Sequence, residues 1–100
     1  MGKFQLSEIA AADFEAIFLF TAERFGTYQA EGYAEGLNRT FALLADFPLM
    51  GRETLELKRG IRRFAYQSHV ILYRPSDESV VIVAIVHGKR NLHRHILDEL

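Results

Sequence analysis

The amino-acid sequence predicts an α+β fold in which a helical hairpin packs on one face of a mostly antiparallel four-stranded sheet. Two long segments with helical spacing of apolar residues fill the first half of the chain, and three shorter segments that predict strands follow. A length of 100 residues, 49% of them hydrophobic, suits one domain whose core needs no cross-links. We therefore expect a single domain over residues 1–100 with the order β-α-α-β-β-β-α.

The first half is expected to form one strand and two helices. Residues 4–6 alternate apolar and polar side chains, which predicts a short strand. Ser7 can cap a helix that ends at Gly26, because glycine adopts a left-handed C-terminal conformation at little cost. Thr27 can cap a second helix, which ends at Phe47 because a residue that precedes proline is disfavoured in helical geometry. A connection this short makes the two helices an antiparallel hairpin.

Two glycines interrupt the second helix. Gly32 and Gly36 lie four residues apart, and each costs about 1 kcal/mol relative to alanine in a helix interior. They indicate either close contact with a neighbouring element or two tolerated weak positions, and both interpretations stay open.

The connection over residues 48–60 is unusually apolar. Its large side chains are Leu49, Met50, Leu55 and Leu57. We expect them to fold back on the core, because a small domain needs every apolar contact, and a docking surface is the alternative.

Three strands and a short helix are expected in the second half. Residues 61–66 alternate, residues 69–74 are apolar on both faces, and residues 80–86 are almost continuously β-branched. The last of these is the expected central strand. Turns are expected at residues 67–68 and 75–79. A terminal helix is expected because Leu92, Ile96 and Leu100 share one helical face.

Composition limits the class of protein. The absence of cysteine excludes disulfides and thiolate metal sites, and it favours the reducing cytoplasm. The N-terminus lacks the apolar run of a signal peptide, and the longest apolar run falls far short of the ~20 residues of a membrane span. Residues 1–50 carry three basic and seven acidic residues, whereas residues 51–100 carry nine and six. This division suggests two faces with different partners.

Motifs of common enzymes and cofactor sites are absent from the sequence. His93 and His95 point to different faces of a helix, and Glu31 and Glu35 are expected on a solvated face. We therefore expect no catalytic residue, metal or cofactor.

A basic set in the second half is the most informative group of side chains. Arg62 or Arg63 should lie near Arg74, because adjacent ends of antiparallel strands meet, whereas the position of His87 beside the turn at residues 67–68 depends on the register. Such guanidinium groups bind phosphate or an acidic partner, or else they protect a sheet edge from aggregation. The full set of candidates for contacting a target is Arg62, Arg63, Arg74, His87, Lys89 and Arg90.

Six short strings share their order and spacing with one toxin superfamily. They are residues 12–17, 21–26, 47–52, 60–64, 69–74 and 86–90. On these strings the chain resembles the ParE branch of the RelE/ParE toxins of bacterial type II toxin–antitoxin pairs. The resemblance implies a toxin that traps DNA gyrase on cleaved DNA and is not itself an enzyme. It implies no membrane association and no sequence-specific nucleic-acid binding by the toxin alone.

The same resemblance implies a ParD-like antitoxin that neutralises the toxin by direct binding. Antitoxins of this kind use a partly disordered segment that folds along the toxin, either as a helix in a groove or as an added strand. The candidate contacts are the apolar side chains of the connection: Leu49, Met50, Leu55 and Leu57.

Two alternatives remain. A RelE-like mRNA endonuclease needs positive groups around the scissile phosphate and a residue that moves protons. The net charge of −1 and the lack of tyrosine after Tyr73 argue against it, although histidines could act in place of tyrosine. The other alternative is an inactive relative that only binds its antitoxin. The residues that the endonuclease would use are His87, His93, His95, Arg62, Arg63 and Arg74.

Overall fold

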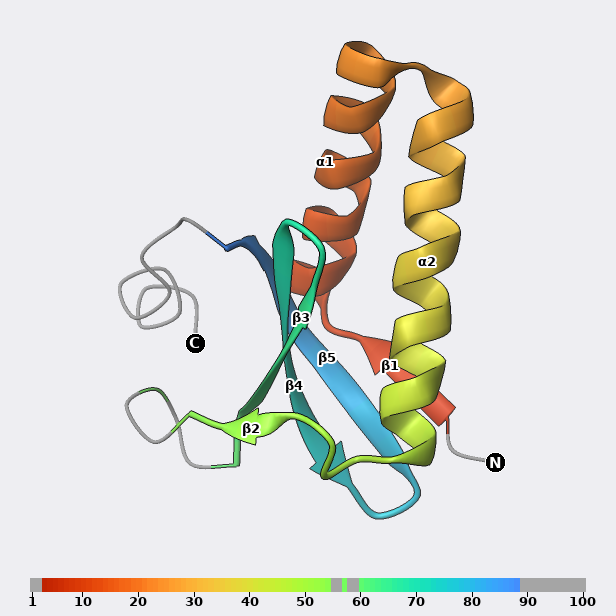
Figure 1. The fold of residues 1–100 in the computed structure, drawn as a ribbon. Helices are drawn as coiled ribbons and strands as arrows, with labels where there is room; N and C mark the ends of the chain where they lie inside the picture. Colours follow the sequence, from red (N-terminus) through yellow and green to blue (C-terminus); the bar gives the residue numbers. More distant parts are fainter. Residues whose placement is uncertain (1–2, 55–56, 58–59, 89–100) are drawn as a thin grey trace.

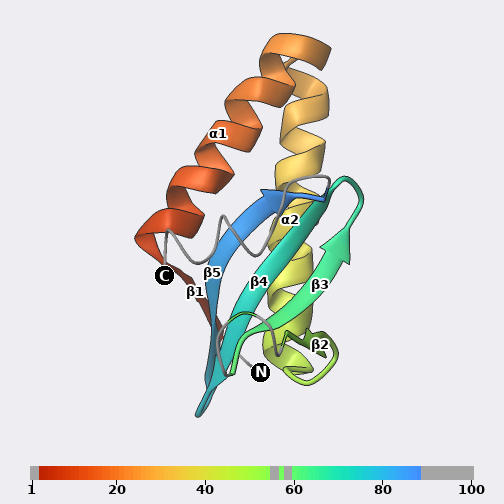
Figure 2. The same cartoon turned by 90° about the vertical axis from the view of Figure 1, so that its left-hand side faces the viewer.

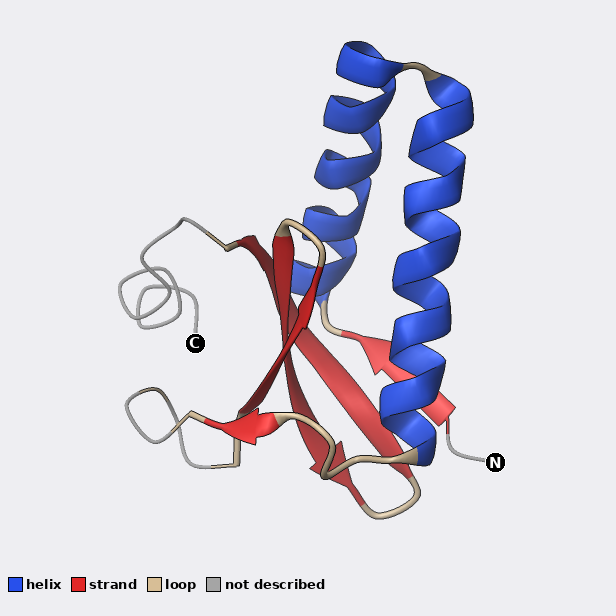
Figure 3. Ribbon diagram, in the orientation of Figure 1, coloured by secondary structure: helices blue, strands red, loops and turns tan. Residues whose placement is uncertain are grey.

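A computed structural model describes residues 3–54, 57 and 60–88 of the chain. Two antiparallel helices cover one face of a five-stranded mixed sheet, as Figure 1 and Figure 3 show, and the predicted α+β arrangement is confirmed. Neither helix in this part of the chain is long and apolar enough to cross a membrane. The elements are β1 (Lys3–Leu6), α1 (Glu8–Phe25), α2 (Thr27–Asp46), β2 (Arg52–Glu53), β3 (Arg62–Tyr66), β4 (His69–Ser76) and β5 (Ser79–His87).

The sheet has the order β1-β5-β4-β3-β2, so it contains one strand more than the sequence predicts. The additional strand, β2, lies inside the expected loop, where Arg52 pairs with Arg63 and Glu53 with Arg62. Its pairing is extended by Thr54, whose amide and hydroxyl both donate to the carbonyl oxygen of Ile61 at 3.0 Å. β5 lies between β1 and β4, so β4 rather than residues 80–86 is the middle strand.

The start of α1 is attached to β5 by side-chain hydrogen bonds. β1 pairs parallel to β5 and ends with Leu6 opposite Ile82, so the next backbone groups of β5 have no strand partner on that side. The Ser7 hydroxyl donates to the carbonyl oxygen of Val83 at 2.8 Å and accepts from the amide of Ala10 at 3.0 Å, which confirms the predicted cap. The Asp13 carboxylate accepts the amide of Ile85 at 2.9 Å.

The helical hairpin forms as the sequence predicts, apart from its second cap. Gly26 ends α1 with φ of +97° and ψ of 159°, a conformation nearly restricted to glycine. The same residue is the N-cap of α2, so the expectation that Thr27 caps this helix is wrong: Thr27 is its first helical residue, and no side chain caps it. α2 ends at Asp46, and its C-cap is Phe47, whose amide donates to the carbonyl oxygen of Leu43.

A β-bulge in β5 fixes which side chains face the helices. The β4–β5 register shifts between Leu72 and Tyr73, which leaves Val83 unpaired and turns it to the same face as Ala84. The core between helices and sheet includes Phe41, Leu44, Ile71, Tyr73 and Ile82. The opposite face carries a second buried cluster that includes Ile61, Val70, Leu72, Val83 and Val86.

β4 is longer than predicted and the turn after it is shorter. The strand continues through Pro75 and Ser76, which pair with Val80 and Ser79, so only residues 77–78 remain in the turn. β3 pairs with β4 only as far as Tyr73, so Pro75, which has no amide hydrogen, lies where β4 has a single neighbour. The predicted terminal helix lies outside the described residues.

The two helical glycines have different environments. A Cβ added at Gly36 would lie 1.8 Å from the Tyr66 hydroxyl oxygen and 2.7 Å from the ring carbon that carries it, whereas nothing lies within 4 Å of a Cβ at Gly32. Close contact therefore explains Gly36, and Gly32 is a tolerated weak position.

We expect opposite effects from alanine at these two positions. Gly32→Ala should raise the free energy of unfolding by up to about 1 kcal/mol, because alanine stabilises a helix interior. Gly36→Ala should instead lower it by about 1–3 kcal/mol, because the methyl group overpacks against Tyr66. Urea denaturation of both variants measures the difference, and a Gly36→Ala variant as stable as Gly32→Ala would contradict the close packing.

Candidate functional site

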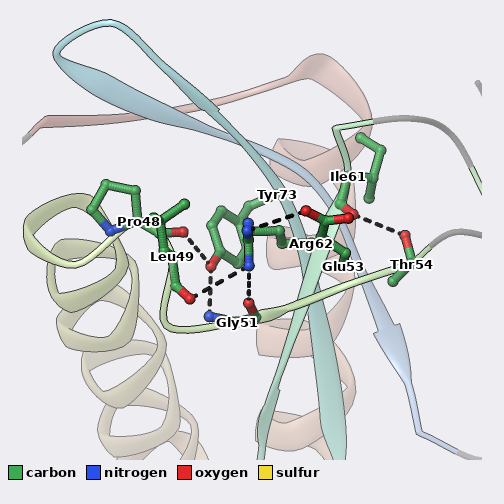
Figure 4. Close-up of polar contacts among 8 residues, drawn as sticks. All are labelled: Pro48, Leu49, Gly51, Glu53, Thr54, Ile61, Arg62 and Tyr73. Atoms are coloured by element: carbon green, nitrogen blue, oxygen red, sulfur yellow. Dashed lines mark hydrogen bonds and ion pairs between the residues drawn. The ribbon is translucent and has the colours of Figure 1, made fainter.

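A buried tyrosine holds the loop that follows α2. Tyr73 is fully buried, and its hydroxyl donates to the carbonyl oxygen of Pro48 at 2.7 Å and accepts from the amide of Gly51 at 2.8 Å. Figure 4 shows this hydroxyl between the two ends of the loop. Burial raises the pKa of Tyr73 above its usual value, although the amide of Gly51 and the charge of Arg62 oppose the rise. The hydroxyl therefore keeps the proton that bridges to Pro48.

Arg62 completes this loop clamp, a name we use for Tyr73, Arg62 and the backbone of residues 48–51. Its guanidinium donates to the carbonyl oxygens of Leu49 and Gly51, and it forms an ion pair with Glu53 at 3.4 Å (Figure 4). Gly51 allows the close approach, since an added Cβ would lie 2.6 Å from the Tyr73 hydroxyl oxygen and 2.7 Å from the carbonyl oxygen of Arg63. Arg62, one of the predicted target contacts, thus has a structural role.

The clamp presents an apolar patch to solvent. Leu49 is 72% exposed and Met50 40% exposed, so these two side chains do not fold back on the core, and their role in a docking surface stays a prediction. Leu57 instead packs against the second buried cluster, as the favoured interpretation expects, and Leu55 lies outside the described residues. The loop patch, as we call it, consists of Leu43, Phe47, Leu49 and Met50, all at least 40% exposed.

The arginines of β3 and β4 lie on two faces of the sheet. Arg62 pairs with Tyr73, which faces the helices, whereas Arg63 pairs with Leu72 in the opposite cluster. Arg74 follows Tyr73 and therefore shares the face of Arg63, as its diagonal neighbour. Arg63 and Arg74 thus form the expected pair of neighbouring cations, on the face away from the helices.

His87 lies at the other end of the sheet. It pairs with His69, and the amide of Gly88 donates to the carbonyl oxygen of Ser68 at 2.8 Å, so the register does place His87 beside the turn. Tyr73, the partner of Arg62, is the fourth residue after His69 in β4, which corresponds to about 13 Å along the strand. His87 and the arginines therefore do not form one site. Lys89 and Arg90 lie outside the described residues.

The helical hairpin projects beyond the sheet (Figures 1 and 2). A cleft lies between the hairpin and the end of the sheet that carries His69 and His87. Its volume is about 540 Å³, within the usual range of ligand and peptide sites. One wall consists of aromatic and aliphatic side chains of α1, and the other of polar groups from α2 and the strand ends. The hairpin cleft, as we call it, includes Phe20, Phe25, Tyr33, Ser68, His69 and His87.

Tyr33, His69 and His87 form a connected polar group in this cleft. The Tyr33 hydroxyl oxygen lies 2.7 Å from Nδ1 of His69, and the two imidazole centroids are 5.5 Å apart. Burial, and secondarily the charge of His87, lowers the pKa of His69, while burial raises the pKa of Tyr33. At neutral pH the group therefore consists of a neutral imidazole ring that is hydrogen-bonded to a protonated phenol.

Sequence analysis did not identify Tyr33 or His69 as site residues. Tyr33 fits the apolar stripe of α2, and His69 begins a strand whose partner residue depends on the bulge at Val83. Among the described residues, no group of three or more histidine, aspartate or glutamate side chains could hold a metal ion.

Comparison with known proteins identifies the class. A family profile described as "ParE toxin of type II toxin-antitoxin system, parDE" matches residues 4–92. Toxin ParE1 of Caulobacter vibrioides is 35% identical over 96 residues, which cover 96% of this chain and 99% of that protein. Toxin ParE1 of Mycobacterium tuberculosis is 30% identical over 95 residues, which cover 94% and 97%.

Solved structures show the same fold at lower identity. A chain of the chromosomal ParDE system from P. aeruginosa superposes with a TM-score of 0.73 at 19% identity, covering 87% of this chain and 96% of that one. The isolated E. coli RelE toxin superposes with a TM-score of 0.59 at 12% identity, covering 98% and 97%. The fold is that of RelE/ParE-type toxins. On the sequence matches, the chain belongs to the ParE toxin family of type II toxin–antitoxin systems.

The clamp predicts a measurable contribution of one hydroxyl group. Tyr73→Phe leaves the amide of Gly51 and the carbonyl of Pro48 without their buried partner, so it should lower the free energy of unfolding by about 1–3 kcal/mol. Tyr28→Phe is the matched control, because Tyr28 is 91% exposed and its hydroxyl should contribute within about 0.5 kcal/mol. Urea denaturation compares the two, and equal stabilities would exclude the clamp as a stabilising contact.

Proposed function

We propose that this protein is a toxin that inhibits DNA gyrase and is neutralised by direct binding of a cognate ParD-like antitoxin. The observation that carries the proposal is the family match over residues 4–92, together with 35% identity to a toxin ParE1 over nearly its whole length. The solved relative with the higher similarity comes from a ParDE system, which supports the pairing with an antitoxin.

The arrangement of the polar residues supports a binding protein over an mRNA endonuclease. The endonuclease alternative needs a histidine close to arginines that could hold a phosphate, yet about 13 Å of strand separates His87 from Arg62. The other two candidate histidines, His93 and His95, lie outside the described residues. Arg62 is also engaged in the loop clamp. The neutral His69 beside Tyr33 is the observation that keeps the endonuclease as second candidate, since such a ring can accept a proton.

The loop patch is the surface that we assign to the antitoxin. Its four apolar side chains are exposed at the end of α2, and the clamp holds the loop backbone in one conformation. A preorganised apolar surface suits a partly disordered segment, because the toxin then loses little conformational entropy when the partner folds onto it. The antitoxin would supply complementary apolar side chains at this position.

We assign the contact with gyrase to basic residues of the second half of the chain. Arg63 and Arg74 share one sheet face, and Lys89 and Arg90 follow β5 in the sequence. A cationic surface of this kind binds acidic protein segments or phosphate groups, both of which a gyrase–DNA complex offers.

The purified protein should cause cleaved DNA to accumulate in a gyrase supercoiling reaction, while mRNA on programmed ribosomes stays intact. Lys89→Glu/Arg90→Glu should abolish the DNA cleavage at equal protein concentration, because the charge of the contact is reversed. The control Lys3→Glu/Arg39→Glu makes the same charge change at exposed positions of the acidic half. Cut mRNA with unaffected gyrase would move the chain to the endonuclease branch, and no effect in either assay would identify an inactive relative.

Leu49→Asp/Met50→Asp should weaken antitoxin binding by about 2 kcal/mol or more, because both side chains are exposed apolar residues of the loop patch. The control Leu19→Asp/Tyr28→Asp adds the same charge on the helical hairpin, where the side chains are 60% and 91% exposed. Leu57→Asp is unsuitable, since Leu57 packs against the second cluster. Titration calorimetry decides, and equal affinities for the two double variants would rule out this surface.

A further inference from the structure

The paired ends of β4 and β5 hold two imidazole rings opposite each other. His69 and His87 are direct partners in the antiparallel ladder, so their side chains leave the sheet on the same face. Both line the hairpin cleft, His69 half-buried and His87 exposed. We propose that His69 and His87 together bind a divalent transition-metal ion, Zn²⁺ in the first instance, through one nitrogen of each ring.

The separation of the rings suits this assignment. Their centroids lie 5.5 Å apart with the ring planes at 77°. A tetrahedral ion with Zn–N bonds of 2.0–2.1 Å holds two imidazole centroids about 5 Å apart. The rings meet edge to face, so a rotation of the exposed His87 side chain about its own bonds must turn one of its nitrogens toward the ion. Imidazole is a preferred ligand of zinc, nickel and copper, so the site fits these ions rather than magnesium or calcium.

Tyr33 supplies the outer contact that metal-binding histidines require. Its hydroxyl oxygen lies 2.7 Å from Nδ1 of His69 and 3.5 Å from the carbonyl oxygen of Tyr66. With the ion on Nε2 of His69, the ring proton is on Nδ1 and is donated to the Tyr33 oxygen. The hydroxyl proton of Tyr33 then points to the carbonyl of Tyr66. This chain fixes the tautomer and orientation of the ligand, as outer contacts do in known metal sites.

Two protein ligands make this an exchangeable site. Among the described residues no third histidine, aspartate or glutamate side chain joins the pair, so water in the cleft would fill the positions of the ion that these residues leave open. Structural zinc sites use four protein ligands, and a site with two binds more weakly. The ion would therefore be gained or lost with the metal concentration while the protein stays folded.

The test is a titration of the full-length, tag-free protein with ZnCl₂, followed by nuclear magnetic resonance of the histidine rings. We expect the ring signals of His69 and His87 to shift together and to saturate at one ion per chain. His87→Asn should abolish the joint shift. Tyr33→Phe should retain binding but weaken the affinity about 10- to 100-fold, the usual loss when an outer contact of a ligand is removed.

The C-terminal histidines provide the matched control. His93→Ala/His95→Ala removes two imidazoles that are not part of the proposed site, and this variant should bind Zn²⁺ with unchanged affinity. Shifts confined to His93 and His95 would overturn the assignment, as would a folded His87→Asn variant with wild-type affinity. Absence of any shift in the His69 and His87 signals would also overturn it. His87 is exposed, so its replacement tests the site without disturbing the core.

Discussion

The structure depends on how the backbone hydrogen bonds of β5 are satisfied beyond the end of β1. β1 ends opposite Ile82, and beyond this point the backbone of β5 would face the helices with unpaired polar groups, at a cost that buried backbone rarely tolerates. The Ser7 hydroxyl and the Asp13 carboxylate take up these groups at Val83 and Ile85. The same serine caps α1, so a single residue fixes where the helix begins, where it meets the sheet and how the hairpin is oriented over the core.

Much of this arrangement follows from local rules in the sequence. Helical periodicity, the Ser7 cap, the stop at Gly26 and the proline after Phe47 define the hairpin without any knowledge of its partners. The bulge at Val83 does not follow, because Ala84 is the only break in the run of β-branched residues of β5, and one alanine does not specify a change of register. The register of β4 and β5 starts from the pair of Ser76 and Ser79 at the turn. Without the bulge this register would pair His69 with Val86, and the additional residue in β5 brings His69 opposite His87 instead.

The candidate sites likewise contain some features that the sequence predicts and others that it does not. The apolar side chains at residues 49–50 stand out in the sequence, and their exposure matches one of the two interpretations open to them. The role of Arg62 could not be predicted, because its partners are backbone carbonyls of a loop more than ten residues earlier in the chain. In the sequence, Tyr73 likewise cannot be distinguished from an ordinary core residue of β4. Charge and hydrophobicity are local properties, whereas these hydrogen bonds depend on the tertiary fold.

The position of Tyr73 has a consequence for the lifetime of the chain. The ring of Tyr73 belongs to the core, and its hydroxyl fixes the loop at the surface, so the loop patch keeps this geometry only while the sheet is intact. A partner that binds this patch therefore binds only the folded chain, and its binding shifts the folding equilibrium toward the folded state. Proteases that act on transiently unfolded molecules would then degrade the captured chain more slowly than the solitary one.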